Sequence, residues 1–186
     1  MKQINLLLLA FILFPILNGC SYLKPVYFRK QEINSRYPNG NLRTQFYYKR
    51  NKLNGTVTLF DSTGNVELKF ESDDSIEYDT LNYMKIDSNE IKKLDVSKIG
   101  KETDKYSTQL GKKYGEYFSH GVTGTGIFWI WYNSNGDAVH VICKESKYIN
   151  FRLIELVVRD METWKLPKEL AGSGLFAKQK INFQGN

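Results

Sequence analysis

The sequence predicts a mainly β fold, a β-rich α+β class in which antiparallel hairpins form a sheet with two or three short helices. Residues 66–71 alternate apolar and charged side chains, which is the pattern of a half-exposed strand. Asn-Gly pairs at residues 39–40 and 135–136 favour tight turns between extended segments. Residues 127–132 are all β-branched or aromatic, which indicates a central strand buried on both faces or nearly so.

The chain begins with a segment that has the composition of a signal peptide. Lys2 supplies a positive charge, and residues 4–17 are apolar except at Asn5 and Pro15. This length suits the apolar region of a signal peptide and falls short of the roughly 20 residues of a spanning helix. An uncleaved N-terminal helix is the alternative interpretation.

The end of this segment, Leu17-Asn18-Gly19-Cys20, resembles the lipobox of bacterial lipoproteins. The resemblance implies that residues 1–19 are a lipoprotein signal peptide, and that the Cys20 thiol receives a diacylglyceryl group before cleavage. It implies palmitate on the mature chain and membrane attachment through residues 20–31, a lipid-anchored tether. Ser21 follows the cysteine directly. By the sorting rule of Gram-negative lipoproteins, a serine at this position directs the protein to the outer membrane. Whether the protein faces the periplasm or the cell surface stays open.

Charge and length give weaker constraints. The chain has 186 residues and a formal net charge of +6, with its basic residues scattered among acids. This length suits one domain or two small ones. We interpret the charge as a solvated surface, with weak attraction to anionic lipid or lipopolysaccharide as the alternative. An export signal argues against a nucleic-acid partner.

Residues 32–72 form the most patterned region. An aromatic residue, a turn glycine and an apolar residue recur: Tyr37, Gly40 and Leu42 are followed by Phe60, Gly64 and Val66. With Tyr48 and Leu53-x-Gly55 between them, they resemble the variant MORN repeat of bacterial proteins described as antitoxin-like. The resemblance implies β-hairpins stacked side by side in a scaffold.

Residues 73–170 are expected to form an α+β sheet region. A capping box from Asp87 to Glu90 opens a short helix, and a second helix is expected from Thr103 or Asp104 to Gly115. Strands are expected at residues 76–79, 81–86, 116–120, 127–132, 138–144 and 151–159. Loops are expected at 96–102 and at the glycine-rich 121–126, a helix or turn at 160–170 anchored by Trp164, and a flexible C-terminal tail at 171–186.

The side chains that could perform chemistry are few. His140 alternates with Val139 and Val141, which favours a hydrogen-bonded sheet histidine over a catalytic base. The glycine-rich loop lacks the Lys-Ser/Thr of a phosphate-binding loop, and no catalytic motif or metal-ligand spacing is found. Cys143 lies in an apolar run and is expected to be a buried, inert thiol; an intermolecular disulfide is the alternative.

Trp129 and Trp131 are the candidate binding residues. They share one face of the strand at 127–132. We expect this strand to be central and covered on one side by the helix bearing Tyr106, Leu110 and Tyr114. Core packing is the expected role of both tryptophans. If their face is exposed, it is a binding surface for a partner.

The sequence therefore predicts an outer-membrane lipoprotein of the cell envelope with a non-catalytic binding or scaffolding role. It is expected to bind a protein partner and the membrane, and to need neither a cofactor nor a metal. An immunity or inhibitor lipoprotein acting on a toxic protein is one alternative, and an envelope assembly factor is another.

Overall fold

The structure, a computed structural model, describes residues 30–72, 88–91, 93–118 and 123–185. Residues from Gln31 onward form one compact unit. The expected signal peptide at 1–19, Cys20, Ser21 and the strands expected at 76–79 and 81–86 lie outside the described residues. The mainly antiparallel β class is confirmed, with eight strands in the described part of the chain.

The strands fall into a hairpin half and a central half. The hairpin half contains β1 (Gln31–Arg36), β2 (Leu42–Lys49), β4 (Thr56–Phe60) and β5 (Val66–Glu71), with the short β3 (Lys52–Leu53) between β2 and β4. The central half contains β6 (Thr123–Tyr132), β7 (Ala138–Lys147) and β8 (Leu175–Gln184). The helices of the described ranges are α4 (Ser88–Ile91), α5 (Val96–Gly115), α6 (Phe151–Met161) and α7 (Lys168–Ala171).

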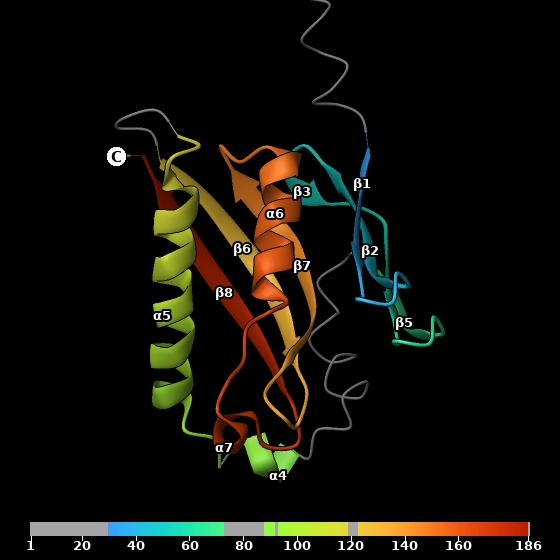
Figure 1. The fold of residues 1–186 in the computed structure, drawn as a ribbon, viewed down its shortest axis with the longest axis vertical. Helices are drawn as coiled ribbons and strands as arrows, with labels where there is room; N and C mark the ends of the chain where they lie inside the picture. Colours follow the sequence, from blue (N-terminus) through green and yellow to red (C-terminus); the bar gives the residue numbers. More distant parts are fainter. Residues whose placement is uncertain (1–29, 73–87, 92, 119–122, 186) are drawn as a thin grey trace, which may run out of the picture. The chain divides into compact units, whose positions relative to one another are not determined.

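Among the described residues, all strand pairings are antiparallel, in the order β5-β4-β2-β3-β7-β6-β8, and β1 pairs with the other edge of β2. The two halves are joined in the ladder through one described residue pair, Lys52 of β3 with Glu145 of β7. Figure 1 shows α6 in front of β6 and β7, and α5 beside β8. The hairpins expected between residues 32 and 72, and the one between β6 and β7, are therefore present.

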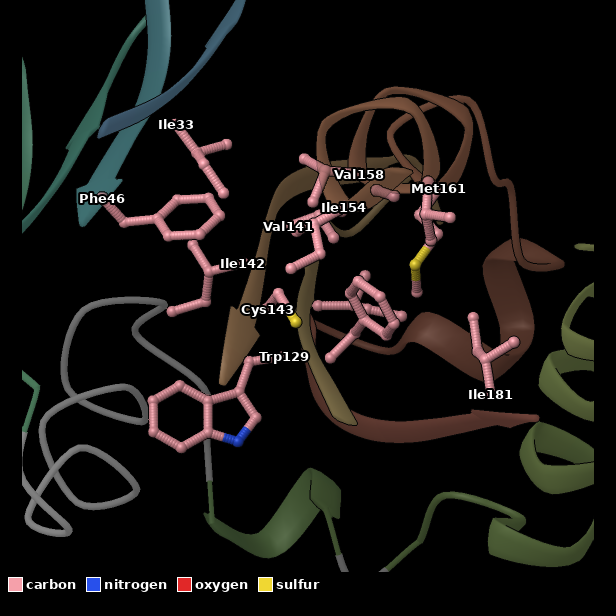
Figure 2. Close-up of a cluster of buried hydrophobic side chains, with 14 of the residues drawn as sticks. Ile33, Phe46, Trp129, Val141, Ile142, Cys143, Ile154, Val158, Met161 and Ile181 are labelled. Atoms are coloured by element: carbon pink, nitrogen blue, oxygen red, sulfur yellow. The ribbon is translucent and has the colours of Figure 1, made fainter. Parts of the chain in front are cut away.

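One hydrophobic core spans both halves. Ile33 and Phe46 come from the hairpin half, and they belong to the same buried cluster as Ile142 of β7 and Ile154 of α6 (Figure 2). Every residue of this cluster lies between Ile33 and Phe183. A chain that begins at Ser21 therefore retains the complete described core.

The strand expected at residues 151–159 is wrong, because this segment is the helix α6. Its buried residues recur with helical spacing at Leu153, Ile154, Val157, Val158 and Met161. The side chain of Asn150 accepts a hydrogen bond from the Leu153 amide (2.9 Å) and caps the helix. The nearly continuous apolar run concealed this period.

The flexible tail expected at residues 171–186 is also wrong, because residues 175–184 form β8 and pair with β6 along ten residues. Gln179, Ile181 and Phe183 are buried, and the residues between them are exposed. This alternation is the signature of a strand with one buried face. The glycine-rich loop expected at 121–126 is wrong in its described part, because β6 begins at Thr123.

The helix expected to begin at Thr103 or Asp104 begins earlier, so the loop expected at 96–102 is wrong as well. The side chain of Asp95 accepts a hydrogen bond from the Lys98 amide (3.1 Å) and caps α5. The predicted end at Gly115 is confirmed. The helix packs mainly against β8 rather than over β6, because β8 occupies the position beside β6.

The edge strand β8 is covered by two glycines of α5. A Cβ on Gly111 would lie 2.5 Å from the carbonyl oxygen of Asn182, and one on Gly115 would meet the carbonyl oxygen of Gln184 equally closely. Only glycine allows the helix to approach this edge so closely. The contact hides backbone carbonyls that would otherwise be open to pairing with another chain.

We expect Gly115→Ala to lower the free energy of unfolding by about 1–3 kcal/mol, because the new methyl group overlaps the backbone of β8. Gly100→Ala in the same helix is the control, since nothing lies within 4 Å of its added Cβ. That change should stabilise the protein by about 0.4–1 kcal/mol. Urea unfolding of the chain from Ser21 onward measures both values, and equal stabilities of the two variants would contradict the packing.

Candidate functional site

The two halves meet at a buried polar cluster beside β7, which we call the seam cluster. Its residues come from β1, β2, β5, β7 and the end of α6, and they are Ser35, Arg43, Thr44, Glu67, His140 and Glu162. Arg43 is its centre. Its Nε donates to the Val139 carbonyl (2.6 Å), and its Nη2 donates to the Ala138 carbonyl. One guanidinium group therefore binds the edge of β7 in two places.

Glu162 is the carboxylate of the seam cluster. Its side chain is only 5% exposed, its Oε2 lies 3.6 Å from Arg43 Nη1, and its Oε1 accepts a 2.5 Å hydrogen bond from Ser35. Burial raises the pKa of Glu162 to about 7, because the loss of hydration outweighs the attraction of Arg43. Near neutral pH this carboxyl group is therefore close to half protonated.

His140 is fully buried and has a partner on each ring nitrogen. Nε2 lies 2.9 Å from Glu67 Oε2, and Nδ1 lies 3.3 Å from Thr44 Oγ1. Burial lowers the pKa of His140, so the imidazole is neutral. With the Glu67 carboxylate as acceptor, Nε2 carries the proton of the neutral imidazole. The prediction of a hydrogen-bonded sheet histidine is confirmed.

A polar pocket of about 530 Å³ opens beside the seam cluster. Its lining comes from the hairpin turns, from β5 and from the segment after α7, and consists of Tyr37, Asp61, Ser62, Glu67, Asn133, Ser134, Val139 and Ser173. Hydroxyl, amide and carboxylate groups predominate. The Oγ atom of Ser173 is buried and has no hydrogen-bond partner among the described residues.

The turns that line this pocket are the ones that carry the repeated sequence pattern. Asp61 accepts hydrogen bonds from the amides of Thr63 and Asn65, both at 2.9 Å. The Thr63 hydroxyl and the Asn65 amide hold the pKa of Asp61 at about 2. Gly64 has φ +96° and Gly136 has φ +83°, so the predicted positive-φ turns are confirmed.

The turns are also bonded to one another. Asn39 and Asn41, in the turn between β1 and β2, donate to the Ser62 carbonyl at 2.7 and 2.9 Å. Asn133 accepts from the amides of Asn135 (2.9 Å) and Asp137 (3.0 Å) and so closes the turn between β6 and β7. The pocket is therefore held by side chains already committed to turn structure, which gives it a fixed shape.

The arrangement suits binding of a polar or cationic group. Asp61 is ionised, and the Glu67 side chain is 36% exposed. Ser62 and Ser134 are exposed residues at the rim of the pocket. Within the described residues, no group of three or more His, Cys, Asp or Glu side chains could hold a metal ion. A hydroxyl-bearing ligand or a basic side chain of a partner fits this lining best.

The residues predicted from the sequence have different locations. Trp129 and Trp131 are 1% and 0% exposed and both contact the ring of Phe176, so their expected role in the core is confirmed and they do not form an exposed platform. Cys143 is a buried free thiol, as predicted. Burial raises its pKa to about 12. Cys20 and Ser21 lie outside the described residues.

Sequence reasoning missed Arg43, Glu67 and Glu162. Glu67 lies in an alternating strand, where its charge indicated only a solvated face. Ser35 and Glu162 are separated by 127 residues in the chain. Only the repeated aromatic, turn and glycine pattern pointed to this end of the molecule.

Comparisons of the chain with protein-family models, curated proteins and solved structures find no match. None of the helices in the described ranges has the length and apolar composition needed to cross a membrane.

We expect Glu162 to make stability fall as pH rises. Between pH 4.5 and 7 the folded chain retains a proton on Glu162 that the unfolded chain has lost. The free energy of unfolding should therefore decrease by about 3 kcal/mol across this range. Glu162→Gln should remove this contribution, and urea unfolding at several pH values measures it.

The difference between wild type and Glu162→Gln is the decisive quantity, because His140 acts in the opposite direction. Its lowered pKa means that the unfolded chain binds the proton more readily near pH 6.5, so its contribution to stability is lost as pH falls. Glu169→Gln, at an exposed residue, controls for the loss of one carboxyl group. A pH-independent difference between wild type and Glu162→Gln would contradict the raised pKa.

Proposed function

We propose that this chain is a lipid-anchored outer-membrane lipoprotein of the bacterial envelope, with a non-catalytic role in binding a partner. The observation that carries the proposal is Leu17-Asn18-Gly19-Cys20 at the end of an apolar leader. Acylation of Cys20 in combination with a second or third chain would attach the protein stably, since a single acyl chain binds a bilayer only marginally.

The arrangement of the compact unit supports this role. The unit begins at Gln31, soon after Cys20, and it contains its own core. β1 leads away from Gln31 to the turn at residues 37–41, where the polar pocket lies. A partner bound there would be held at the end of the unit opposite to Gln31.

The chemistry of the seam cluster and of the neighbouring pocket favours binding over catalysis. His140 is neutral and both of its ring nitrogens have partners. Thr44, the hydroxyl nearest to that imidazole, is fully buried and out of reach of a substrate. The carboxylate of Asp61 is occupied by its own turn. A titratable group that is free to exchange protons with a substrate is the usual requirement for general acid–base catalysis.

An immunity or inhibitor role is the second candidate. Its support is the resemblance of residues 32–72 to the antitoxin-like MORN repeat, a region that forms the hairpin half. The acidic rim of the pocket, with Asp61 and Glu67, would suit a basic surface on a toxic protein. The identity of the captured partner separates this role from an envelope scaffold and from an assembly factor.

Cys20→Ser should abolish incorporation of radioactive palmitate and leave an unprocessed precursor. Cys143→Ser is the matched control, because Cys143 is buried and should not be acylated. Ser21→Asp should move the acylated protein into the inner-membrane fraction of a Gram-negative host. Palmitate labelling that persists in Cys20→Ser would end the proposal of a lipoprotein.

Capture of the partner tests the pocket. Ser134→Arg places a bulky cation at the exposed rim of the pocket, and we expect it to reduce recovery of a cross-linked envelope partner at least about tenfold. Gln109→Arg introduces the same side chain on the exposed surface of α5 and should leave recovery unchanged. Equal recovery with both variants would place the partner elsewhere on the protein.

A further inference from the structure

Three chain segments, one of which begins at Gln31, meet at one end of the compact unit. Gln31 pairs with Tyr48, whose hydroxyl lies 2.6 Å from the Asn51 carbonyl and 2.8 Å from Ser146 Oγ. The Ser146 amide donates to the same Asn51 carbonyl (2.9 Å). The start of β1, the turn between β2 and β3 and the end of β7 therefore share this end, which we call the tether end (Figure 1).

The end of α5 also reaches the tether end. Phe118 follows this helix, and Ile149 follows β7. A Cβ on Gly124 would lie 2.5 Å from the Phe118 ring and 3.2 Å from the Ile149 side chain, so both residues pack over the same glycine. Tyr117 is thus close to the turn that links β7 to α6.

Exposed aromatic side chains gather at the tether end. Tyr148 is 67% exposed, Tyr117 57% and Phe151 39%. In the described part of the chain, the other large exposed hydrophobic residue is Val66, which lies beside the turn at 61–65. The distribution is therefore strongly uneven between the two ends.

Tyr148 occupies a conformation that its side chain does not favour. Its φ is +58°, in the left-handed region that suits glycine or asparagine. The ring does not pack in the core, and the described contact to it is the Lys147 ammonium, 5.1 Å from the ring centre. Neither backbone geometry nor core packing accounts for an aromatic residue at this position, which leaves its exposed face as the feature to explain.

Exposed basic side chains lie on the same segments as these rings. Arg50, Lys52, Lys147 and Arg152 are exposed on the segments that form the tether end, where Glu116 and Glu145 are exposed acids. Aromatic rings that alternate with lysine and arginine are typical of protein surfaces that lie at the headgroup level of a bilayer. The cations attract anionic lipid, and the rings enter the boundary between headgroups and acyl chains.

The tether restricts which end can face a membrane. Ten residues separate Cys20 from Gln31, and they span at most about 35 Å. The helix α5 has 20 residues and extends about 30 Å along the unit. The opposite end could therefore meet the bilayer only with the tether stretched along nearly the whole unit, whereas the tether end meets it without such extension.

We propose that the tether end docks on the surface of an anionic phospholipid bilayer through Tyr148, Phe151, Tyr117 and the neighbouring basic side chains. The proposal rests on the proposed lipid anchor for its orientation. Docking holds the domain upright, with the polar pocket directed away from the lipid.

Fluorescence quenching of the acylated protein tests the orientation. The protein is reconstituted in vesicles of phosphatidylcholine and phosphatidylglycerol that contain nitroxide-labelled lipid. A fluorophore is attached at Glu116→Cys on the tether end or at Ser134→Cys on the opposite turn; the buried Cys143, with its pKa raised to about 12, should not react. We expect several-fold stronger quenching at position 116. Equal quenching at both positions would overturn the proposal.

Flotation of the unacylated chain from Ser21 onward separates docking from anchoring. It should float with anionic vesicles and much less with vesicles of phosphatidylcholine alone, and each of Lys147→Gln and Arg152→Gln should weaken binding about fivefold at low salt. If Cys20 proves unacylated, the proposed anchor is wrong, and flotation of the unacylated chain then decides by itself whether the tether end docks on lipid. Docking is rejected if this chain does not float with anionic vesicles and Cys20 is unacylated. It is also rejected if this chain does not float and the acylated protein shows equal quenching at both positions.

Two substitutions distinguish lipid contact from a structural role. Tyr148→Asn suits the left-handed backbone, so it should keep or raise the melting temperature while it lowers flotation, and Phe151→Gln should add to the loss. Val66→Thr removes another exposed apolar side chain, beside the opposite turns, and should leave flotation unchanged. Loss of flotation in Val66→Thr, or its retention in the Tyr148→Asn, Phe151→Gln double variant, would contradict docking at the tether end.

Discussion

The guanidinium group of Arg43 joins the two halves of the sheet where the ladder cannot. Between β3 and β7 the described ladder is reduced to the Lys52–Glu145 pair. Arg43 compensates by bonding two carbonyls on the free edge of β7 and approaching Glu162 beyond α6. A planar side chain with several fixed donors can satisfy three acceptors from two segments at once, and lysine lacks this geometry.

The seam also determines the chemistry available at the pocket. Burial that the hairpin half imposes on β7 keeps His140 neutral and brings Glu67 to its Nε2. The same burial raises the pKa of Glu162. The two groups respond to pH in opposite senses, so their contributions to the pH dependence of stability partly offset each other.

Local patterns predicted the parts of the fold that local patterns determine. The alternation in β5, the aromatic run in β6 and the glycines of the turns were sufficient for the hairpins, because each depends on neighbours a few residues apart. The helix α6 was missed because its segment is an almost continuous apolar run, which resembles a buried strand. Its five buried residues form two adjacent pairs and one single residue, and only their spacing indicates a helix. The strand β8 was missed since its partner, β6, begins about fifty residues earlier. The Arg43–Glu162 contact could not be predicted, because neither residue has a local signature.

The direction of β1 has a mechanical consequence. Load applied at Gln31 along the axis of β1 acts perpendicular to the hydrogen bonds of the six residue pairs that hold this strand to β2, so it shears them. Hydrogen bonds loaded in shear share the force and must break together. Hydrogen bonds that are pulled along their own direction from one end of a ladder open one after another. A pull between a membrane and a partner held at the far turns would therefore meet the sheet in its strongest direction.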